Sequence, residues 1–321
     1  MTAGGDEQAV GHRPAWAFVA LFAAVVVTSS AALLARSADA PPMALAFWRT
    51  LGAAVFLSGP AIIIRARRRR ADPIAAATGP NTRWLLLGAG AALGLHFATW
   101  LASLELTSVA ASTTLVTITP LLLAGYLTLI GQPPSRTGWI ALALAMAGAV
   151  VITVGDVRTD VRALAGDGLA VAGAGFMAVQ LRLGQHLRQS MSTLDYTSRA
   201  YAVAAVVTGA TALVAGIELW GFDRATWAAI VAMVAGPQLL GHTVLNLLLR
   251  WLDAVTISLA LLLEPLWGTL LVLAVLGEVP PITAVLGAPL ILGGLALHLR
   301  LDGSSQATPA AEVPARSERP G

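Results

Sequence analysis

The chain has 321 residues, of which 57% are hydrophobic and 12% are charged, and its mean hydropathy is +0.76. A soluble globular domain has about 25% charged residues, so this composition excludes an ordinary soluble protein and indicates a bilayer as the solvent. All 20 basic residues are arginine, but they cluster at the ends of apolar segments and form no stripe interleaved with aromatic residues, which excludes a nucleic-acid partner.

Ten apolar segments are long enough to cross the hydrocarbon layer, which needs roughly 20 residues per helix. They cover residues 15–35, 43–64, 84–104, 109–130, 137–154, 166–186, 194–216, 227–249, 255–276 and 281–299. The sequence therefore predicts an all-α polytopic membrane protein with ten transmembrane helices. The first segment has spanning length and more spans follow it, so we expect an uncleaved helix rather than a signal peptide. Disordered tails are expected over 1–14 and 301–321, and a connecting loop over 155–165.

The positions of the arginines predict the orientation, because cytoplasmic loops carry an excess of this residue. If the N-terminus is cytoplasmic, eleven arginines flank the helices inside and four flank them outside. The inner set is Arg13, Arg65, Arg67, Arg68, Arg69, Arg70, Arg83, Arg136, Arg188, Arg250 and Arg300, and the outer set is Arg36, Arg158, Arg162 and Arg224. We therefore expect a cell-membrane protein with both termini cytoplasmic. The cluster RARRRR is interpreted as this topology signal, with membrane lipid as a partner.

The second and third segments carry polar residues that lipid does not solvate. Arg49 lies about six residues inside the second segment, beside Trp48. Snorkelling to the interface is the simpler interpretation, and a site for a solute carboxylate is the alternative. In the third segment, His96 and Trp100 are four residues apart and share one face. They are candidates for solute contact, with an ordinary packing role for His96 as the alternative.

Polar residues also occur in the fourth, sixth and eighth segments. Pro120 breaks the fourth helix, and Gln180 is a candidate to line a cavity from the sixth. Gln238, His242 and Asn246 are spaced four residues apart in the eighth and so share one face. Such a face would be costly in lipid, so it must point into the bundle. There it binds solute, or it forms hydrogen bonds between helices.

The ninth segment holds a single acid, because Glu264 is the only charged residue from 254 to 277. An unpaired acidic residue at this depth costs roughly 2.5–3.5 kcal/mol, so we expect it to face a cavity or a partner. Pro265 follows it and leaves a backbone carbonyl without its usual donor, which lipid cannot replace. We interpret the pair as a kinked, cavity-facing site that couples transport to protons or binds a cationic solute group. A purely structural role in fixing the kink is the alternative.

The two halves of the chain repeat each other. HFATWLASLELTSVAASTTLVTITPLL, from His96, parallels HTVLNLLLRWLDAVTISLALLLEPLW, from His242. Arg49 and Arg199 occupy matching depths in the second helix of each half. A duplicated unit of five helices enters the membrane in opposite senses, which predicts a 5+5 inverted-topology repeat of the kind found in secondary transporters. The repeats are expected over 15–154 and 166–300.

Four stretches in this order resemble the EamA-type transporters of the drug/metabolite transporter superfamily. They are MALAFWRTLGAA (43–54), LASLELTSVAASTTLVTITPLL (101–122), LLGHTVLNLLLRWLDAVTISLALLLEP (239–265) and LGEVPP (276–281). The resemblance spans about residues 15 to 300. It implies ten helices, an inverted repeat, cytoplasmic termini, and transport of small organic metabolites or drugs.

Other functions have less support in the residues. A membrane-embedded enzyme lacks its motifs here, since the chain has no HExxH and no large loop for a catalytic site. A membrane protein that transports no solute is a further alternative. The chain has no cysteine, and nothing near His96 and His242 supplies other zinc ligands, so no metal or cofactor is expected. A small-molecule solute is the expected partner, and a homodimer is left open.

Overall fold

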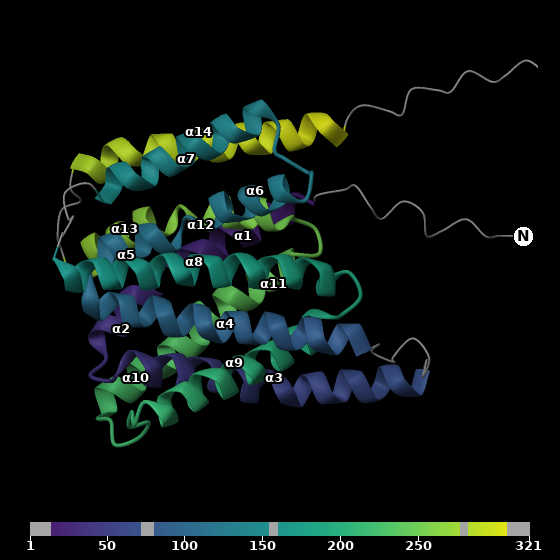
Figure 1. Ribbon diagram of the computed structural model, residues 1–321. Helices are drawn as coiled ribbons and strands as arrows, with labels where there is room; N and C mark the ends of the chain where they lie inside the picture. The colour runs from purple at the N-terminus through teal and green to yellow at the C-terminus, as the bar shows by residue number, and fades with distance from the viewer. Residues whose placement is uncertain (1–13, 72–79, 154–159, 277–281, 307–321) are drawn as a thin grey trace, which may run out of the picture.

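The computed structural model describes residues 14–71, 80–153, 160–276 and 282–306, which are helical almost throughout and contain no strand (Figure 1). The α-helices are α1 (Ala15–Thr28), α2 (Ala31–Ser37), α3 (Pro42–Ala71), α4 (Pro80–Leu106), α5 (Val109–Val116), α6 (Thr119–Leu129), α7 (Arg136–Thr153), α8 (Val161–Arg188), α9 (Thr193–Val214), α10 (Arg224–Met233), α11 (Thr243–Leu248), α12 (Ala254–Leu261), α13 (Glu264–Leu276) and α14 (Ile282–Gln306). A π-helix, η2 (Val234–His242), joins α10 to α11. The predicted all-α architecture is confirmed.

Eight stretches of the described residues are long and apolar enough to cross a membrane. Four of them are single α-helices, and four consist of consecutive pieces: α1–α2, α5–α6, α10–η2–α11 and α12–α13. Two shorter apolar helices, Arg136–Ile152 and Val285–Arg300, occupy the fifth and tenth positions of the predicted series. The first span begins and the last ends at the same end of the bundle, as an even number of crossings requires (Figure 1).

Three predicted boundaries differ from the structure. The arginine cluster does not end α3, which continues to Ala71, because arginine favours helix once the chain has left the membrane. α8 begins at Val161, inside the predicted connecting loop, and α14 continues to Gln306, inside the predicted C-terminal tail. The remaining parts of the predicted tails and of that loop lie mainly outside the described residues.

Short polar side chains fix where several helices begin. Each accepts a hydrogen bond from the backbone N–H three residues later, which satisfies one of the free donors of the first turn. These capping residues are Ser108, Asp160, Ser192, Asp223 and Asp253. Hydrogen bonds from the Thr226 hydroxyl and then from its backbone N–H hold the pKa of Asp223 below its ordinary value. The cap of α10 is therefore ionised at neutral pH.

Helix interruptions within the spans are satisfied locally, as the absence of water in a bilayer demands. The hydroxyls of Thr28 and Ser29 donate to the Val25 carbonyl at 3.0 and 2.7 Å, where α1 ends. The break between α5 and α6 has Thr117 donating to Thr114 at 2.8 Å. Pro120 and Pro265 each lie in the first turn of the piece after a break, where a missing N–H costs nothing.

The π-helix accounts for Pro237 inside the eighth span. In a regular α-helix the proline ring would clash with the carbonyl four residues earlier and kink or break the helix. The wider π turn removes that clash, and the helix continues from α10 through η2 into α11. Gly236-Pro237 therefore produces an irregular turn within a continuous helix. Such π segments are frequent at functional sites.

The two halves of the chain make matching contacts: the main contacts between spans have counterparts in which every span is replaced by the corresponding span of the other half. The second and seventh spans (α3, α9) pair at one edge of the bundle, and the fifth and tenth (α7, α14) pair at the opposite edge (Figure 1). The contact of the third span with the sixth (α4, α8) is matched by that of the eighth with the first (η2, α1). The fourth and ninth spans (α6, α12) meet each other. The arrangement is the expected 5+5 inverted repeat.

Small residues allow the paired helices to approach closely. A Cβ atom added to Gly287 of α14 would lie 2.4 Å from the Gly148 carbonyl oxygen of α7, and one added to Gly148 would lie 2.6 Å from the Gly287 oxygen. Gly90 and Gly94 of α4 approach the backbone of α9 in the same way, at 2.8 and 2.9 Å. Dispersion between closely packed backbones holds helices together in lipid, where the hydrophobic effect contributes little.

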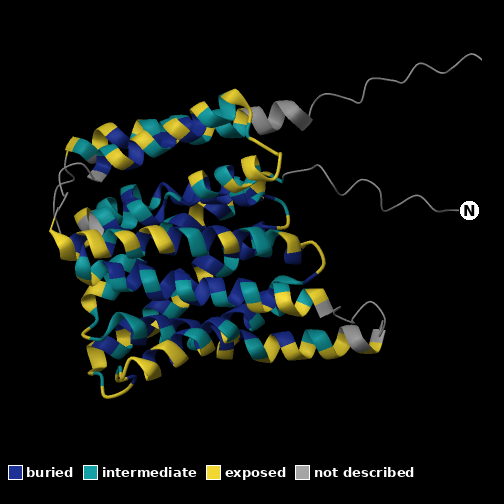
Figure 2. Cartoon of the chain, in the orientation of Figure 1, coloured by how far each residue is buried: buried dark blue, intermediate teal, exposed yellow. Residues whose placement is uncertain are grey.

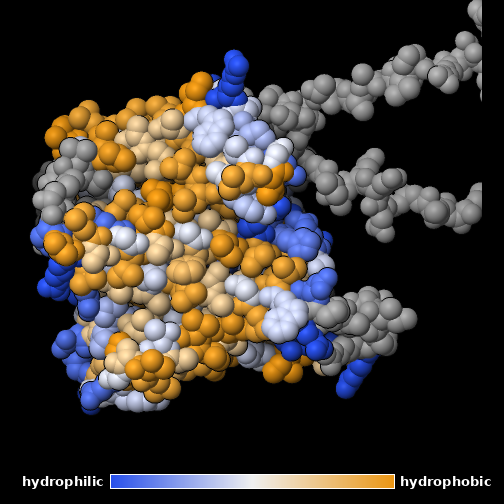
Figure 3. Space-filling view, in the orientation of Figure 1, coloured by the Kyte–Doolittle hydropathy of each residue, from blue (hydrophilic) through white to orange (hydrophobic). Residues whose placement is uncertain are grey.

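The surface fits a bilayer. Hydrophobic residues cover the middle of the visible face and hydrophilic ones gather toward its two ends (Figure 3). Exposed residues lie along the outer faces of the helices, and buried residues lie where helices pack against one another (Figure 2). Tryptophans lie near both ends, as membrane interfaces favour. Trp16 packs on Trp251 near the end at which α1 begins, and Trp48 packs on Trp220 and Trp227 near the other end.

Candidate functional site

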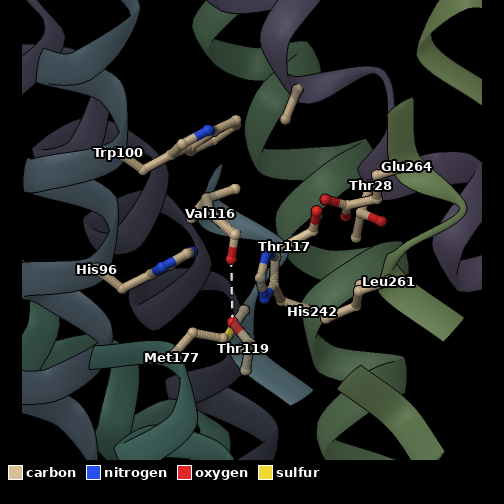
Figure 4. A pocket seen from close by; sticks show the side chains of 11 residues that line it. Thr28, His96, Trp100, Val116, Thr117, Thr119, Met177, His242, Leu261 and Glu264 are labelled. Carbon is tan, nitrogen blue, oxygen red and sulfur yellow. Dashed lines mark hydrogen bonds between the residues drawn. The ribbon is translucent and has the colours of Figure 1, made fainter. Parts of the chain in front are cut away.

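A small cavity lies at the centre of the bundle, next to the helix interruptions. Its lining residues are Thr28, Ala31, His96, Trp100, Val116, Thr117, Thr119, Met177, His242, Leu261 and Glu264 (Figure 4). They come from the first, third and fourth spans and from the sixth, eighth and ninth, so the same three positions of each half contribute. The cavity therefore lies on the pseudo-two-fold axis that relates the halves.

The volume of this central cavity is about 30 Å³. That is room for about one or two water molecules, whereas sites for small organic ligands measure about 300–1,000 Å³. The described conformation is therefore closed around the centre. A second cavity of about 190 Å³, which we call the vestibule, is lined by residues of α2, α3 and α4 and of the α2–α3 connection, among them Ala35, Arg36, Leu101 and Glu105. Ala35, in the vestibule, follows the cavity residue Ala31 by one turn of α2, so the vestibule lies toward the end of the bundle opposite the start of α1 (Figure 1).

Among the residues that the structure describes, Glu264 is the only acidic one that lines the central cavity. It is the first residue of α13, so the break between α12 and α13 brings its carboxyl to the cavity wall. It is partly accessible there and lies beside Thr28 of α1 (Figure 4). Arg49 is close enough to interact with it electrostatically. The expectation that Glu264 faces a cavity and not lipid agrees with this position.

His96 and His242 line the cavity from the matching third and eighth spans, and their ring centroids are 6.4 Å apart. Nδ1 of His96 is 2.9 Å from the Gly173 carbonyl oxygen, which can only accept, so Nδ1 carries the hydrogen. Its Nε2 is then the ring nitrogen available to a water molecule or solute. Trp100 stacks on His96 at 6.3 Å. Within the described residues, no three metal-ligating side chains come together.

Arg49 does not snorkel, and that interpretation is wrong. Its side chain is fully buried and points into the bundle, where Nε donates to Gln238 Oε1 at 2.8 Å. The guanidinium carbon lies 3.9 Å from the centre of the Phe97 ring. Phe97 packs edge-on against His242 at 5.0 Å, so an aromatic layer separates Arg49 from the central cavity. Arg49 therefore lies buried behind residues of the cavity wall and does not line the cavity itself.

The other predicted polar residues of the sixth and eighth spans lie outside the cavity lining in this conformation. The Gln180 amide nitrogen donates to Asn246 Oδ1 at 2.9 Å and to the Tyr196 hydroxyl at 3.1 Å. Asn246 donates to the His242 carbonyl at 2.8 Å. Gln238 is bonded to Arg49, and of the eighth-span stripe His242 alone reaches the cavity. Hydrogen bonds between helices account for these positions.

Several cavity residues had no distinguishing signal in the sequence. Thr28, Thr117 and Thr119 contribute hydroxyl groups, and Met177 contributes a flexible apolar side chain. The hydroxyl-rich run at residues 28–30, in an otherwise apolar segment, could have indicated the break between α1 and α2. The predicted residue Pro120 does not itself line the cavity in this conformation. Its neighbour Thr119, in the same first turn of α6, does.

Comparisons with known proteins agree with this architecture. The model of the EamA-like transporter family matches residues 15–154 and 164–300. A solved structure described only as the crystal structure of a protein has 21% sequence identity and a TM-score of 0.71, covering 91% of this chain and 99% of its own. That likeness supports the fold alone. No match is found among curated proteins.

The two matched ranges each contain five of the spans described above and together cover most of the chain. The family match is to transporters and not to enzymes, which agrees with the absence of enzyme motifs in the sequence. The chain therefore belongs to the EamA-like transporter family and is a multi-pass membrane transport protein with two copies of the family's repeat.

Proposed function

We propose that the protein is a secondary transporter that moves a small organic solute through the central cavity by alternating access. The observation that carries this proposal is the position of the cavity between two inverted five-helix halves, each of which supplies three spans to its wall. Two related halves can pack against each other in two equivalent ways, and each way opens the centre to one side.

The closed cavity and the vestibule fit one such cycle. Trp100 lines the cavity and Leu101 lines the vestibule, so adjacent residues of α4 separate the two spaces. A movement of α4 relative to α2 would join them and expose the centre at the end opposite the start of α1. The opposite movement of the symmetry-related spans would expose it at the other end. Solute enters in one state and leaves in the other.

Glu264 is the proposed coupling group. It lies at the centre of this path, and a carboxyl at that position can take a proton from one side and release it on the other as the halves move. Proton movement in one direction would then drive solute movement. A cationic solute group that binds to the same carboxyl is the alternative role.

Flux in liposomes tests the proposed function. The purified full chain is reconstituted, a pH gradient is imposed, and uptake of common amino acids, nucleobases, monosaccharides and a lipophilic cation is measured. We expect at least one class to enter faster than into protein-free liposomes, and to accumulate when the pH gradient is present. Rates equal to the protein-free control for every class would contradict a transport role for these solutes.

Both termini are proposed to be cytoplasmic. Because the natural chain has no cysteine, single cysteines can be introduced at Ala3 and Ala311 and treated in intact cells with a membrane-impermeant maleimide. We expect neither to react until the cells are opened, and a cysteine at Glu218, in the loop after α9, to react in intact cells. Reaction of either tail before lysis would overturn this orientation.

A further inference from the structure

Arg49 has two buried donor atoms without a partner. Its NH1 and NH2 nitrogens are inaccessible, and no group of the described residues accepts a hydrogen bond from either. The side chain itself is fully buried, and only Nε is satisfied, by Gln238. A guanidinium is charged at every physiological pH, so it cannot avoid this cost by losing its proton. Among the described residues, no carboxylate or other acceptor pairs directly with these two nitrogens.

Two other arginines in or near the bundle do have hydrogen-bond acceptors, a carboxylate for Arg199 and backbone carbonyls for Arg188. Arg199, which matches Arg49 in the second half, pairs with the Asp195 carboxylate at 3.0 Å. Arg188 is almost fully buried, and it donates through Nε to the Asn246 carbonyl at 2.9 Å and through NH1 to the Met191 carbonyl. Arg49 thus differs from its counterpart in lacking a carboxylate that pairs with it directly.

The neighbouring free polar atoms are donors as well. The Gln238 amide nitrogen and the Trp100 indole nitrogen are also buried without a hydrogen-bond partner in the described residues. Trp100 lines the central cavity, and Arg49 lies behind its Phe97–His242 wall. The side of the site that contains Arg49 therefore has an excess of N–H groups, which a ligand rich in acceptors would satisfy. Glu264, on the cavity wall, interacts with Arg49 electrostatically but forms no hydrogen bond with it.

We propose that Arg49 is the binding site for a carboxylate group of the transported solute. The two free N–H groups of a guanidinium match the two oxygens of a carboxylate in a bidentate pair. Negative charge from the solute would offset the buried charge, which neutral water cannot do. This inference rests on the proposed transport function and specifies its substrate class as small organic acids, including molecules with additional charged groups.

The route to Arg49 passes through the aromatic layer. His242 and Gln238 both belong to η2, whose π turn and Pro237 make it the irregular part of the eighth span. A shift of η2 during opening would move His242 away from Phe97 and enlarge the cavity as far as the guanidinium. The site is thus closed in the described conformation and becomes available as the cavity expands.

Binding of acids and their amides tests this assignment. The full chain in lipid nanodiscs is heated, and tryptophan fluorescence gives the unfolding midpoint with each of the common L-amino acids and the two- to six-carbon mono- and dicarboxylic acids. Each acid is paired with its primary amide, which has nearly the same shape without the negative charge. We expect at least one acid to raise the midpoint and its amide to leave it unchanged. No rise with any acid, or equal rises with acid and amide, would overturn the assignment.

Variants of Arg49 complete the test. For an acid that binds, we expect Arg49→Lys to raise the Kd about tenfold or more, equivalent to about 1.4 kcal/mol. Lysine keeps the positive charge but cannot form the bidentate pair of hydrogen bonds with a carboxylate. Arg49→Met should abolish binding, and Arg199→Lys, the matched control, should leave it unchanged. Wild-type affinity in Arg49→Lys and Arg49→Met would overturn the assignment. Flux of neutral or cationic solutes alone would also overturn it, and it would leave the transport function intact.

Discussion

Glu264→Gln is expected to abolish pH-driven accumulation of solute in liposomes. Glutamine keeps the size of the side chain and its ability to hydrogen-bond, but it cannot take up or release a proton. Exchange of labelled for unlabelled solute needs no net proton transfer, so it should persist. Accumulation should fall to the level of protein-free liposomes, with exchange within about tenfold of wild type, the range attributed to one altered polar contact.

Glu105→Gln is the matched control for this experiment. Glu105 is also an acid near a water-accessible space, but it is exposed at the vestibule and lies outside the central cavity. We expect it to accumulate solute like the wild type. If Glu264→Gln accumulates solute to the wild-type level under the same gradient, Glu264 does not couple protons. If exchange and accumulation are lost together, the carboxylate serves solute binding instead.

Gly287→Val is expected to separate α14 from α7 and to destabilise the protein strongly. The first carbon of any side chain at Gly287 would lie 2.4 Å from the Gly148 oxygen and 2.6 Å from Ile152 Cγ1. The first contact is with backbone, which cannot rotate away, so the helices must move apart. Overpacking of this kind costs about 1–3 kcal/mol, which lowers the midpoint of thermal unfolding by about 1.5–4.5 °C in a protein of this size.

The same substitution at Gly175 provides the control, because a Cβ atom at that position of α8 has no atom within 4 Å. Tryptophan fluorescence during heating of the protein in nanodiscs gives the midpoint for both variants. We expect Gly175→Val to stay within about 1 °C of the wild type, as substitutions away from tight packing do. Equal midpoints for Gly287→Val and Gly175→Val would show that close approach of α7 and α14 contributes little.

The main features of the fold were predictable because they depend on composition and repetition. Apolar segments of spanning length predicted the crossings, and the duplicated five-helix unit predicted the symmetric packing that the structure has. Pro120 and Pro265 marked two of the interruptions. The interruption after Thr28 had no proline to mark it, and the π turn at 234–242 depends on how the chain accommodates Pro237 in its tertiary surroundings.

The site was harder to predict, because periodicity shows which residues share a face but not what that face meets. Glu264, His96, Trp100 and His242 line the cavity as expected. Gln180 and Asn246 lie on inward-pointing faces of their helices, but they hydrogen-bond to each other and do not line the cavity. Arg49 lies close to the end of its predicted segment, which suggested that its side chain reaches the membrane interface. Its buried position depends on contact with Gln238, which is far away in the sequence. Pairings between spans are properties of the packed bundle and are not encoded locally.

Cysteine accessibility at Ala31 tests alternating access most directly. Ala31 is buried in the described conformation and lines the central cavity, and Ala35 lies one turn further along α2 in the vestibule. In uniformly oriented liposomes of the cysteine-free chain with Ala31→Cys, an impermeant maleimide is added on either side. We predict reaction from both sides, each slower than that of Ala35→Cys from the vestibule side. The measurement is made with the pH gradient in each direction. If Ala31→Cys reacts from one side only, or from neither side, under both gradients, the result would contradict a central cavity that opens in turn to each face of the membrane.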